Sequence, residues 1–302
     1  MSPPSEASVA SSTLGIASYF DETVQFYRVF WHGNTGALHF GMGCRAAGTH
    51  QQRLLNTNRV LADAIDVLPG ERVLDAGCGV GGSALWLATH RRARVVGVTV
   101  SAAQVRIARA AAADAGLADA VEFMHEDFTR TTLPDANFDV VWALESSCYA
   151  ADKDAFLAEM GRVLRPGGRF VMADGFLGRA PGSRREERLY ETFKRGLVLP
   201  DLPTADRFAA AMRRHGFVDV RAARHDRDVT ASCRRLFWHC LLTYPLARAG
   251  RALGVVSTTL LANSRAGIAA YVLLRRGIAE YAVIVARKPS PGDATRGDPR
   301  PA

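Results

Sequence analysis

A glycine-rich loop preceded by an aspartate is the segment whose residue types best suit ligand binding. With that aspartate, Asp75, it reads DAGCGVGG over residues 75–82. Asp75 is also the last residue of the short apolar run Arg72–Asp75. Gly77 and Gly79 lack a Cβ atom, so the backbone there can turn sharply and approach a ligand closely. The helix expected to follow offers free N–H groups and a partial positive charge to an anionic group, while Asp75 can accept a hydrogen bond from an ammonium. A zwitterion of the methionine type suits this pair of features.

The same loop satisfies the G-x-G-x-x-G pattern through Gly77, Gly79 and Gly82, so a dinucleotide is the alternative ligand. A dinucleotide-binding fold expects a carboxylate about 20 positions further on, where it holds the ribose. That place is occupied by Val98-Thr99-Val100, which contains no carboxylate. The sequence therefore favours S-adenosylmethionine (SAM) over a nicotinamide cofactor.

Glu145 is the best candidate for a catalytic base. It follows the apolar run Val140–Leu144, which predicts a buried strand ending at the rim of the site. Burial raises the pKa of a carboxyl group and lets it act as a base near neutrality. The alternatives are a carboxylate that caps the helix after Ser146-Ser147 or one that orders a water beside SAM.

Four ring-bearing residues are candidates for the substrate pocket: Tyr27, Trp31, His39 and Tyr149. Core packing is the alternative for each aromatic residue, and His39 is interpreted as a structural or cofactor-side histidine rather than a base. The remaining histidines form no cluster with ligand spacing, so no catalytic zinc is predicted.

An alternation of strands and helices must position these residues. Strands are expected at 72–75, 93–98, 120–124, 138–143, 169–173, 217–222 and 281–286, and helices at 17–30, 51–66, 83–90, 102–115, 153–163, 204–215 and within 230–276. This order predicts an α/β fold: a doubly wound, Rossmann-like sheet, parallel with one antiparallel edge strand, with N-terminal helices and a helical insertion before the last strand. In such sheets ligands bind beyond the carboxyl ends of the strands.

One domain is expected over residues 14–288, between flexible tails at 1–13 and 289–302. Two segments interrupt the strand–helix alternation on the substrate side. Residues 176–202 are charged and predicted to be irregular, whereas residues 230–276 are apolar and mostly helical. The second segment is interpreted as a lid or wall over a greasy pocket, with additional core as the alternative.

Composition narrows the class of protein. The net charge is +8, but only three of the 38 basic residues are lysines and acidic residues interleave with the arginines, so a generally basic surface is favoured over nucleic-acid binding. Five scattered cysteines and the absence of a secretory signal indicate a cytoplasmic protein. The longest apolar stretches are too short to span a bilayer, so no stable membrane insertion is expected; homo-oligomers are compatible with the sequence.

Four segments in order carry a resemblance to class I SAM-dependent methyltransferases, specifically the group of sterol, tocopherol and prenyl diphosphate C-methyltransferases. They are Val73–Gly82, Gly97–Gln104, Glu126-Asp127-Phe128, and Ala143–Tyr149 followed by Leu164–Gly168. The second segment matches that group's G-x-T-x-S-x-x-Q pattern, in which Thr99 takes the place that is usually acidic. The departure is Glu126, which stands in place of glycine in the third segment.

The resemblance implies roles for individual residues. Thr99 and Gln104 would lie by the ribose and methionine moieties of SAM, and Asp127 would approach the adenine amino group. Phe128 and Ala143 complete the predicted cofactor site. Glu145 matches the base of the prenyl enzymes, and the aromatic segment from Tyr19 to Gly41 is similar to one that covers the cofactor in the sterol enzymes.

The expected function is SAM-dependent C-methylation of a hydrophobic small molecule, either an isoprenoid or a related specialised metabolite. O- or N-methylation on the same fold is the alternative. Mg²⁺ is expected only if the substrate is a diphosphate. In that case Arg184, Arg185, Arg188 or Arg195 would face the phosphates, although a solvated charged face is favoured for them.

Overall fold

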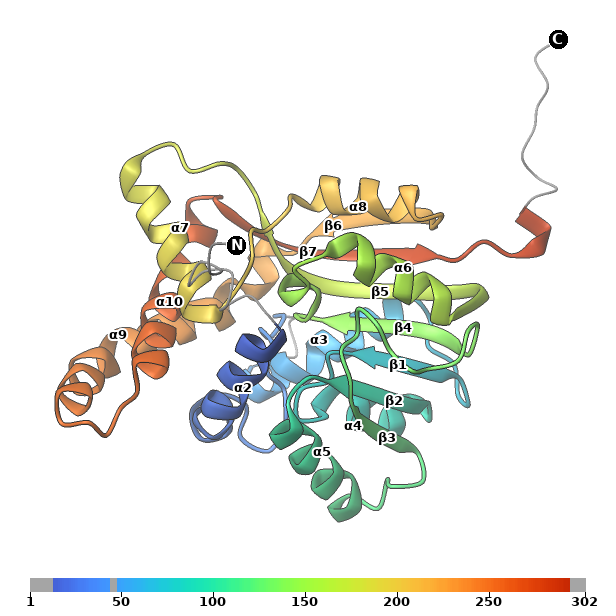
Figure 1. Cartoon of the computed structure of the whole chain (residues 1–302), viewed down its shortest axis with the longest axis horizontal. Coiled ribbons are helices and arrows are strands. Elements are labelled where there is room, and N and C mark those ends of the chain that lie inside the picture. Colours follow the sequence, from blue (N-terminus) through green and yellow to red (C-terminus); the bar gives the residue numbers. More distant parts are fainter. Residues whose placement is uncertain (1–12, 44–47, 294–302) are drawn as a thin grey trace, which may run out of the picture.

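The computed structural model describes residues 13–43 and 48–293, which form a seven-stranded sheet with helices on both faces (Figure 1). The strand order is β3-β2-β1-β4-β5-β7-β6. The strands are β1 (Arg72–Ala76), β2 (Arg94–Thr99), β3 (Val121–His125), β4 (Phe138–Leu144), β5 (Leu164–Leu177), β6 (Val218–Arg224) and β7 (Ala279–Arg287). The predicted doubly wound fold is confirmed.

The antiparallel strand is β7, which lies at one side of the sheet between β5 and the outermost strand β6. It pairs along most of its length with β5, for example Val171 with Val285 and Gly175 with Tyr281. β7 is therefore the strand that joins β6 to the rest of the sheet.

Apart from α7, which was not predicted, the longer helices fall where the apolar periodicity predicts them, with shifts of a few residues at their ends. They are α2 (Thr13–Tyr27), α3 (His50–Ala64), α4 (Gly82–Arg91), α5 (Ala102–Asp114), α6 (Lys153–Val163), α7 (Arg184–Leu197), α8 (Ala205–Arg214), α9 (Asp226–Ala252) and α10 (Thr258–Arg275), with short turns η1 (Arg28–His32), η2 (Ser147–Tyr149) and η3 (Pro291–Asp293). Side chains of α6 and α8 form the core on one face of the sheet. Side chains of α3, α4 and α5 form the core on the other face.

The interpretation of residues 176–202 as irregular is wrong. β5 continues to Leu177, and α7 follows as a regular helix whose Ser183 side chain caps its first turn. Tyr190 of this helix is buried and packs with Leu189 and Phe193 against α10, which contributes Ala269 and Leu273. The charged residues on its solvent face obscure that apolar stripe in the sequence.

The apolar segment 230–276 forms two helices, α9 and α10, that run as a hairpin and project from the body of the molecule (Figure 1). The predicted tails lie mostly outside the described residues. Thr13 belongs to α2, and η3 is held by an ion pair between Arg287 and Asp293, so the described part of the C-terminal segment is ordered. None of the described helices has the length and apolar character needed to cross a membrane.

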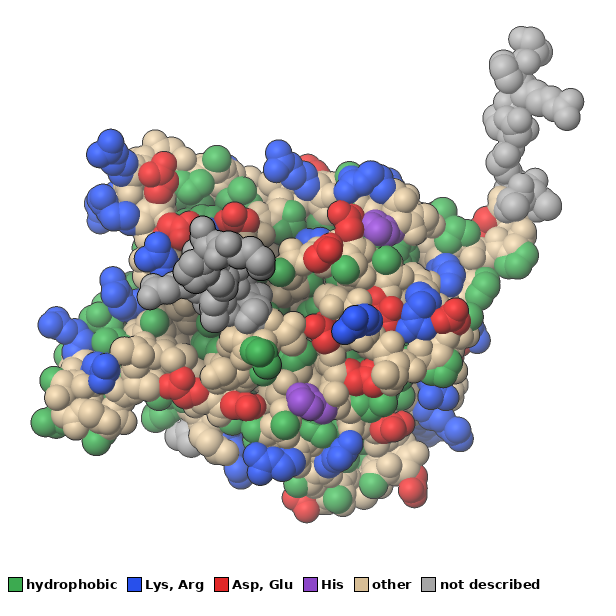
Figure 2. Space-filling model, viewed as in Figure 1, with side chains coloured by type: hydrophobic (Ala, Val, Ile, Leu, Met, Phe, Trp, Pro, Cys, Tyr) green, Lys and Arg blue, Asp and Glu red, His purple; other side chains and the backbone are tan. Residues whose placement is uncertain are grey.

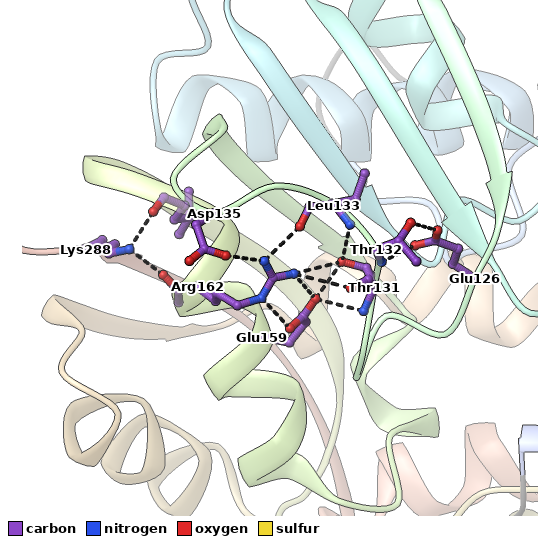
Figure 3. A network of polar contacts seen from close by, with 10 residues as sticks. Glu126, Thr131, Thr132, Leu133, Asp135, Glu159, Arg162 and Lys288 are labelled. Carbon is purple, nitrogen blue, oxygen red and sulfur yellow. Dashed lines mark hydrogen bonds and ion pairs between the residues drawn. The ribbon is translucent and has the colours of Figure 1, made fainter.

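An arginine network fixes the connection between β3 and β4 (Figure 3). Arg162 of α6 forms ion pairs with Glu159 and Asp135 and donates to the carbonyl oxygen of Leu133 at 2.8 Å. Glu159 in turn accepts from the Thr131 backbone N–H at 2.8 Å. This network holds the segment that directly follows Asp127 and Phe128.

Candidate active site

A cavity of about 370 Å³ lies at the carboxyl ends of the central parallel strands, where the fold predicts a ligand. Successive strands bring Asp75, Thr99, Asp127, Glu145 and Asp174 to its wall. The opposite wall comes from α2, α7, α9 and α10.

The glycine loop turns between β1 and α4 with a backbone that requires glycine. Gly77 has φ +96° and Gly79 φ +54°. A Cβ atom at Gly77 would stand 2.3 Å from Ser146 Cβ, because the loop packs tightly against the residues after β4. The backbone N–H groups of Gly77 and Cys78 both donate to the carbonyl oxygen of Val98 at 3.0 Å, which ties the loop to β2.

Two buried polar atoms beside this loop have no partner among the described residues: Asp75 Oδ2 and Gln104 Nε2. Burial raises the pKa of Asp75 to about 7. Thr99 Oγ1 donates to Gln104 Oε1 at 2.7 Å, and this bond leaves the amide N–H groups of Gln104 as unused donors. Unpartnered buried polar groups are costly, and because Asp75 and Gln104 both line the cavity, their free atoms are available to a ligand there.

These residues fit the methionine end of SAM. The Asp75 carboxylate would accept from the ammonium, and Gln104 would donate to the carboxylate. The site therefore presents an acceptor, Asp75, and a donor, Gln104, to a zwitterion.

Of the three remaining predicted cofactor residues, two line the cavity and one lies in the core. Asp127 and Phe128 line the cavity. Asp127 Oδ2 accepts from Thr13 Oγ1 at 2.9 Å, so α2 begins directly over this part of the site. Ala143 is fully buried in the core beneath the sheet end and does not line the cavity, whereas the next residue, Leu144, does.

Glu145 lies at the turn after β4 with φ +48°, a conformation that few residues other than glycine adopt. Its Oε1 atom accepts from the Phe40 backbone N–H at 2.7 Å and from the Tyr281 hydroxyl at 2.8 Å. Burial raises its pKa to about 8, and the negative charge of Asp174 adds to the shift. The carboxyl group is thus oriented by two donors and is part of the cavity wall.

Sequence reasoning missed Tyr281 and Asp174, the two residues that surround Glu145. Asp174 is buried and accepts from Ser147 Oγ at 2.8 Å and from the Cys148 N–H at 2.9 Å, which fixes the turn η2 after Glu145. Its position at the end of the predicted fifth strand was the available signal. Tyr281 lies on β7, far along the chain, and carried no such signal.

The predicted aromatic residues all line the cavity. The hydroxyl groups of Tyr27 and Tyr19 share a hydrogen bond of 3.0 Å, and the Tyr27 hydroxyl also accepts one from Asn263 Nδ2 at 2.9 Å. Tyr149 packs edge-to-face against Phe20 of α2. Both rings therefore combine packing with a position on the cavity wall.

His39 and Trp31 lie together on the N-terminal side of the cavity. Trp31 Nε1 donates to the His39 carbonyl oxygen at 3.2 Å, and His39 Nδ1 donates to the Phe40 carbonyl oxygen at 2.9 Å. Burial lowers the pKa of His39 to about 4, so its ring is neutral at pH 7. The hydrogen bonds of the His39 ring and backbone hold in place the segment whose Phe40 N–H donates to Glu145.

The four arginines considered for phosphate binding, Arg184, Arg185, Arg188 and Arg195, are exposed on α7 and are not part of the cavity wall. Within residues 13–43 and 48–293, no group of three or more histidine, cysteine or acidic side chains is arranged to hold a metal ion.

A family model described as a methyltransferase domain matches residues 74–172. The 27-O-demethylrifamycin SV methyltransferase of Amycolatopsis mediterranei is 32% identical over 67% of this chain and 72% of its own length. The chain belongs to the class I SAM-dependent methyltransferases.

Two further comparisons show the breadth of this family. The 24-methylenesterol C-methyltransferase 2 of Oryza sativa subsp. japonica is 31% identical over 70% of this chain and 58% of that protein. The crystal structure of geranyl diphosphate C-methyltransferase from Streptomyces coelicolor A3(2) superposes with a TM-score of 0.71 at 21% identity, covering 95% of this chain and 100% of that one. The chain spans about half the length of the first curated relatives it matches.

Proposed function

We propose that this protein transfers a methyl group from SAM to a carbon atom of a hydrophobic small molecule, an isoprenoid or a related specialised metabolite, with Glu145 as the base. The observation that carries the proposal is the Glu145 carboxyl group, held by two donors in a wall that also contains Tyr27, Tyr149 and Tyr281.

Bound SAM supplies an electrophilic methyl group on a sulfonium. Methylation of an alkene forms a C–CH₃ bond as the S–CH₃ bond breaks, and it leaves a positive charge on the acceptor. Nearby aromatic faces stabilise such a cation by up to about 2 kcal/mol when water is excluded. The Glu145 carboxylate then accepts a proton from the neighbouring carbon, and the electrons of that C–H bond restore the double bond.

The side chains that α7, α9 and the segment after α7 contribute to the cavity wall suit a hydrophobic methyl acceptor. Leu197, Leu199 and Leu202 from the α7 region and Leu236 from α9 contribute apolar side chains to the wall. Residues 176–202 and 230–276 thus serve as the substrate-side parts of a single catalytic domain over 14–288.

Replacement of Glu145 by Gln tests the base. Glutamine keeps an oxygen that can accept from Phe40 and Tyr281, so the fold and SAM affinity should be preserved, while turnover should fall by roughly 10²–10⁴-fold. Turnover of the parent protein should rise with pH as the carboxyl, whose pKa is about 8, loses its proton. Steady-state rates and SAM titrations of Glu145→Gln, with the exposed Glu122→Gln as control, measure both effects; full turnover in Glu145→Gln would disprove the assignment.

O-methylation is the second candidate, since the relative from Amycolatopsis is named as a methyltransferase of a 27-O-demethyl compound. In that reaction Glu145 would remove a hydroxyl proton. Incubation with methyl-labelled SAM and candidate prenyl or hydroxyl-bearing acceptors, followed by NMR of the product, identifies the methylated atom. Label found only on oxygen or nitrogen would overturn C-methylation.

A further inference from the structure

The projecting hairpin of α9 and α10 exposes a continuous apolar stripe. Along α9 the exposed side chains recur at three- and four-residue intervals, and the turn that follows adds two more: Trp238, Leu241, Leu242, Leu246, Leu253 and Val255. Leu242, Leu246, Leu253 and Val255 are each more than 70% exposed, at 71%, 75%, 79% and 78%. Large apolar side chains gathered in this way mark an interaction surface.

The charge around this stripe has a single sign. From Val229 to Ala279 the sequence contains no aspartate or glutamate. Arg234 and Arg235 are exposed one turn before Trp238, and Arg248 and Arg251 are exposed beside the distal leucines. Within the described part of the chain these four arginines form no ion pair. In Figure 2 the hairpin shows hydrophobic and basic side chains together.

This combination fits an anionic lipid surface. Helices that lie in a membrane interface combine Trp and Leu on one side with arginines that contact lipid phosphates. A second copy of the chain is a poorer partner, because a symmetric contact would bring the same unpaired arginines together without any acidic residue. The net charge of +8 also attracts the whole molecule to an anionic membrane.

We propose that the α9–α10 hairpin docks the protein reversibly on anionic membranes. The inner sides of the same helices contribute Leu236, Asn263 and Gly267 to the cavity wall. Docking therefore places the elements that enclose the cavity at the lipid surface. The proposal holds for either class of methyl transfer, because it rests on the outer surface of the hairpin alone.

Vesicle sedimentation tests the proposal on the full chain. The parent protein should bind vesicles of phosphatidylcholine mixed with phosphatidylglycerol, bind phosphatidylcholine alone much more weakly, and dissociate as salt is added. Arg234→Gln/Arg235→Gln should weaken binding roughly 25-fold, at about fivefold for each arginine near the surface. Leu242→Ser/Leu246→Ser should weaken it by about tenfold or more, because each leucine loses the free energy of apolar burial.

Matched controls are Arg184→Gln/Arg185→Gln on α7 and Leu55→Ser/Leu68→Ser, whose side chains are exposed outside the hairpin. All variants should keep the parent SAM affinity, which shows that they are folded. Equal binding to both kinds of vesicle, or equal losses in the controls and the hairpin variants, would overturn the proposal. Light scattering gives a third test: a parent dimer that Leu242→Ser/Leu246→Ser converts to a monomer would show that the surface joins two copies instead.

Discussion

Asp75 and Glu145, two of the carboxyl groups in the cavity wall, differ in their hydrogen-bond partners. Asp75 Oδ2 has no partner among the described residues, whereas Glu145 Oε1 accepts from two donors. Burial raises the pKa of both, to about 7 for Asp75 and about 8 for Glu145. Asp75 therefore has an oxygen available to a cationic ligand. The carboxyl group of Glu145 is instead held in one orientation by its two donors.

This difference predicts that SAM binding depends on pH through Asp75. In the proposed role, the ionised Asp75 carboxylate binds the ammonium of SAM, so affinity should rise as pH increases towards about 7 and then level off. Below that pH, binding should release a proton. Asp75→Asn should bind SAM roughly 10–100-fold more weakly, through loss of a charged hydrogen bond, and with little dependence on pH.

Calorimetric titrations in two buffers of different ionisation enthalpy measure both the affinity and the proton release. The exposed Asp119→Asn should behave like the parent protein. Unchanged pH dependence in Asp75→Asn would contradict this role.

At the scale of elements, α2 is fastened over the cavity by one side chain from α10. Asn263 donates to the hydroxyl groups of Tyr19 and Tyr27, and all three residues line or adjoin the cavity. Asn263→Ala should therefore increase hydrogen exchange in α2 at least several-fold and leave β1 and β4 protected, because the central sheet does not depend on this contact.

Hydrogen-exchange mass spectrometry checks this outcome. Ser264→Ala is the control, since among the described residues the Ser264 hydroxyl donates only to the Leu260 carbonyl oxygen of the same helix. Unchanged exchange of α2 in Asn263→Ala would show that other contacts hold this helix in place.

The sequence was sufficient to predict the elements that depend on local patterns. β1, the glycine loop and α4 follow one another directly, so Asp75 and Gly77 could be assigned from spacing alone. α7 could not, because arginines and glutamates dominate its first two turns and its apolar stripe is evident only once α10 packs on it. The donors to Glu145 were also missed, since Phe40 and Tyr281 lie 105 and 136 positions away in the sequence.

At the scale of the whole molecule, the buried titratable groups predict that stability declines as pH rises above about 6.5. Between about pH 4.5 and 6.5 the two carboxyl groups and the two histidines act in opposite directions and largely offset one another. The raised pKa values of Asp75 and Glu145 mean that the folded state holds protons that the unfolded chain has lost, so their contribution declines as pH rises towards about 8. Burial lowers the pKa of His39 and His50 to about 4, so their contribution is lost as pH falls from about 6.5 through 4. Above pH 6.5 only the carboxyl groups act, and stability should fall.

Urea unfolding of the ligand-free protein at a series of pH values tests this expectation. Asp75→Asn should flatten the decline between pH 6.5 and 8, and saturating SAM should reduce it by stabilising the ionised carboxylate. A free energy of unfolding that rises over this interval would contradict the prediction.

The position of β7 has a consequence for synthesis on the ribosome. The strand is the last of the sheet in sequence, yet it lies between β5 and β6 and carries Tyr281, the hydroxyl donor to Glu145. A nascent chain that has emerged as far as α10 contains the glycine loop and the predicted cofactor residues. In such a chain β6 has no strand to pair with, and Glu145 can be held only by the Phe40 N–H. The carboxyl group proposed as the base therefore gains its second donor only after β7 has been synthesised and has inserted between β5 and β6.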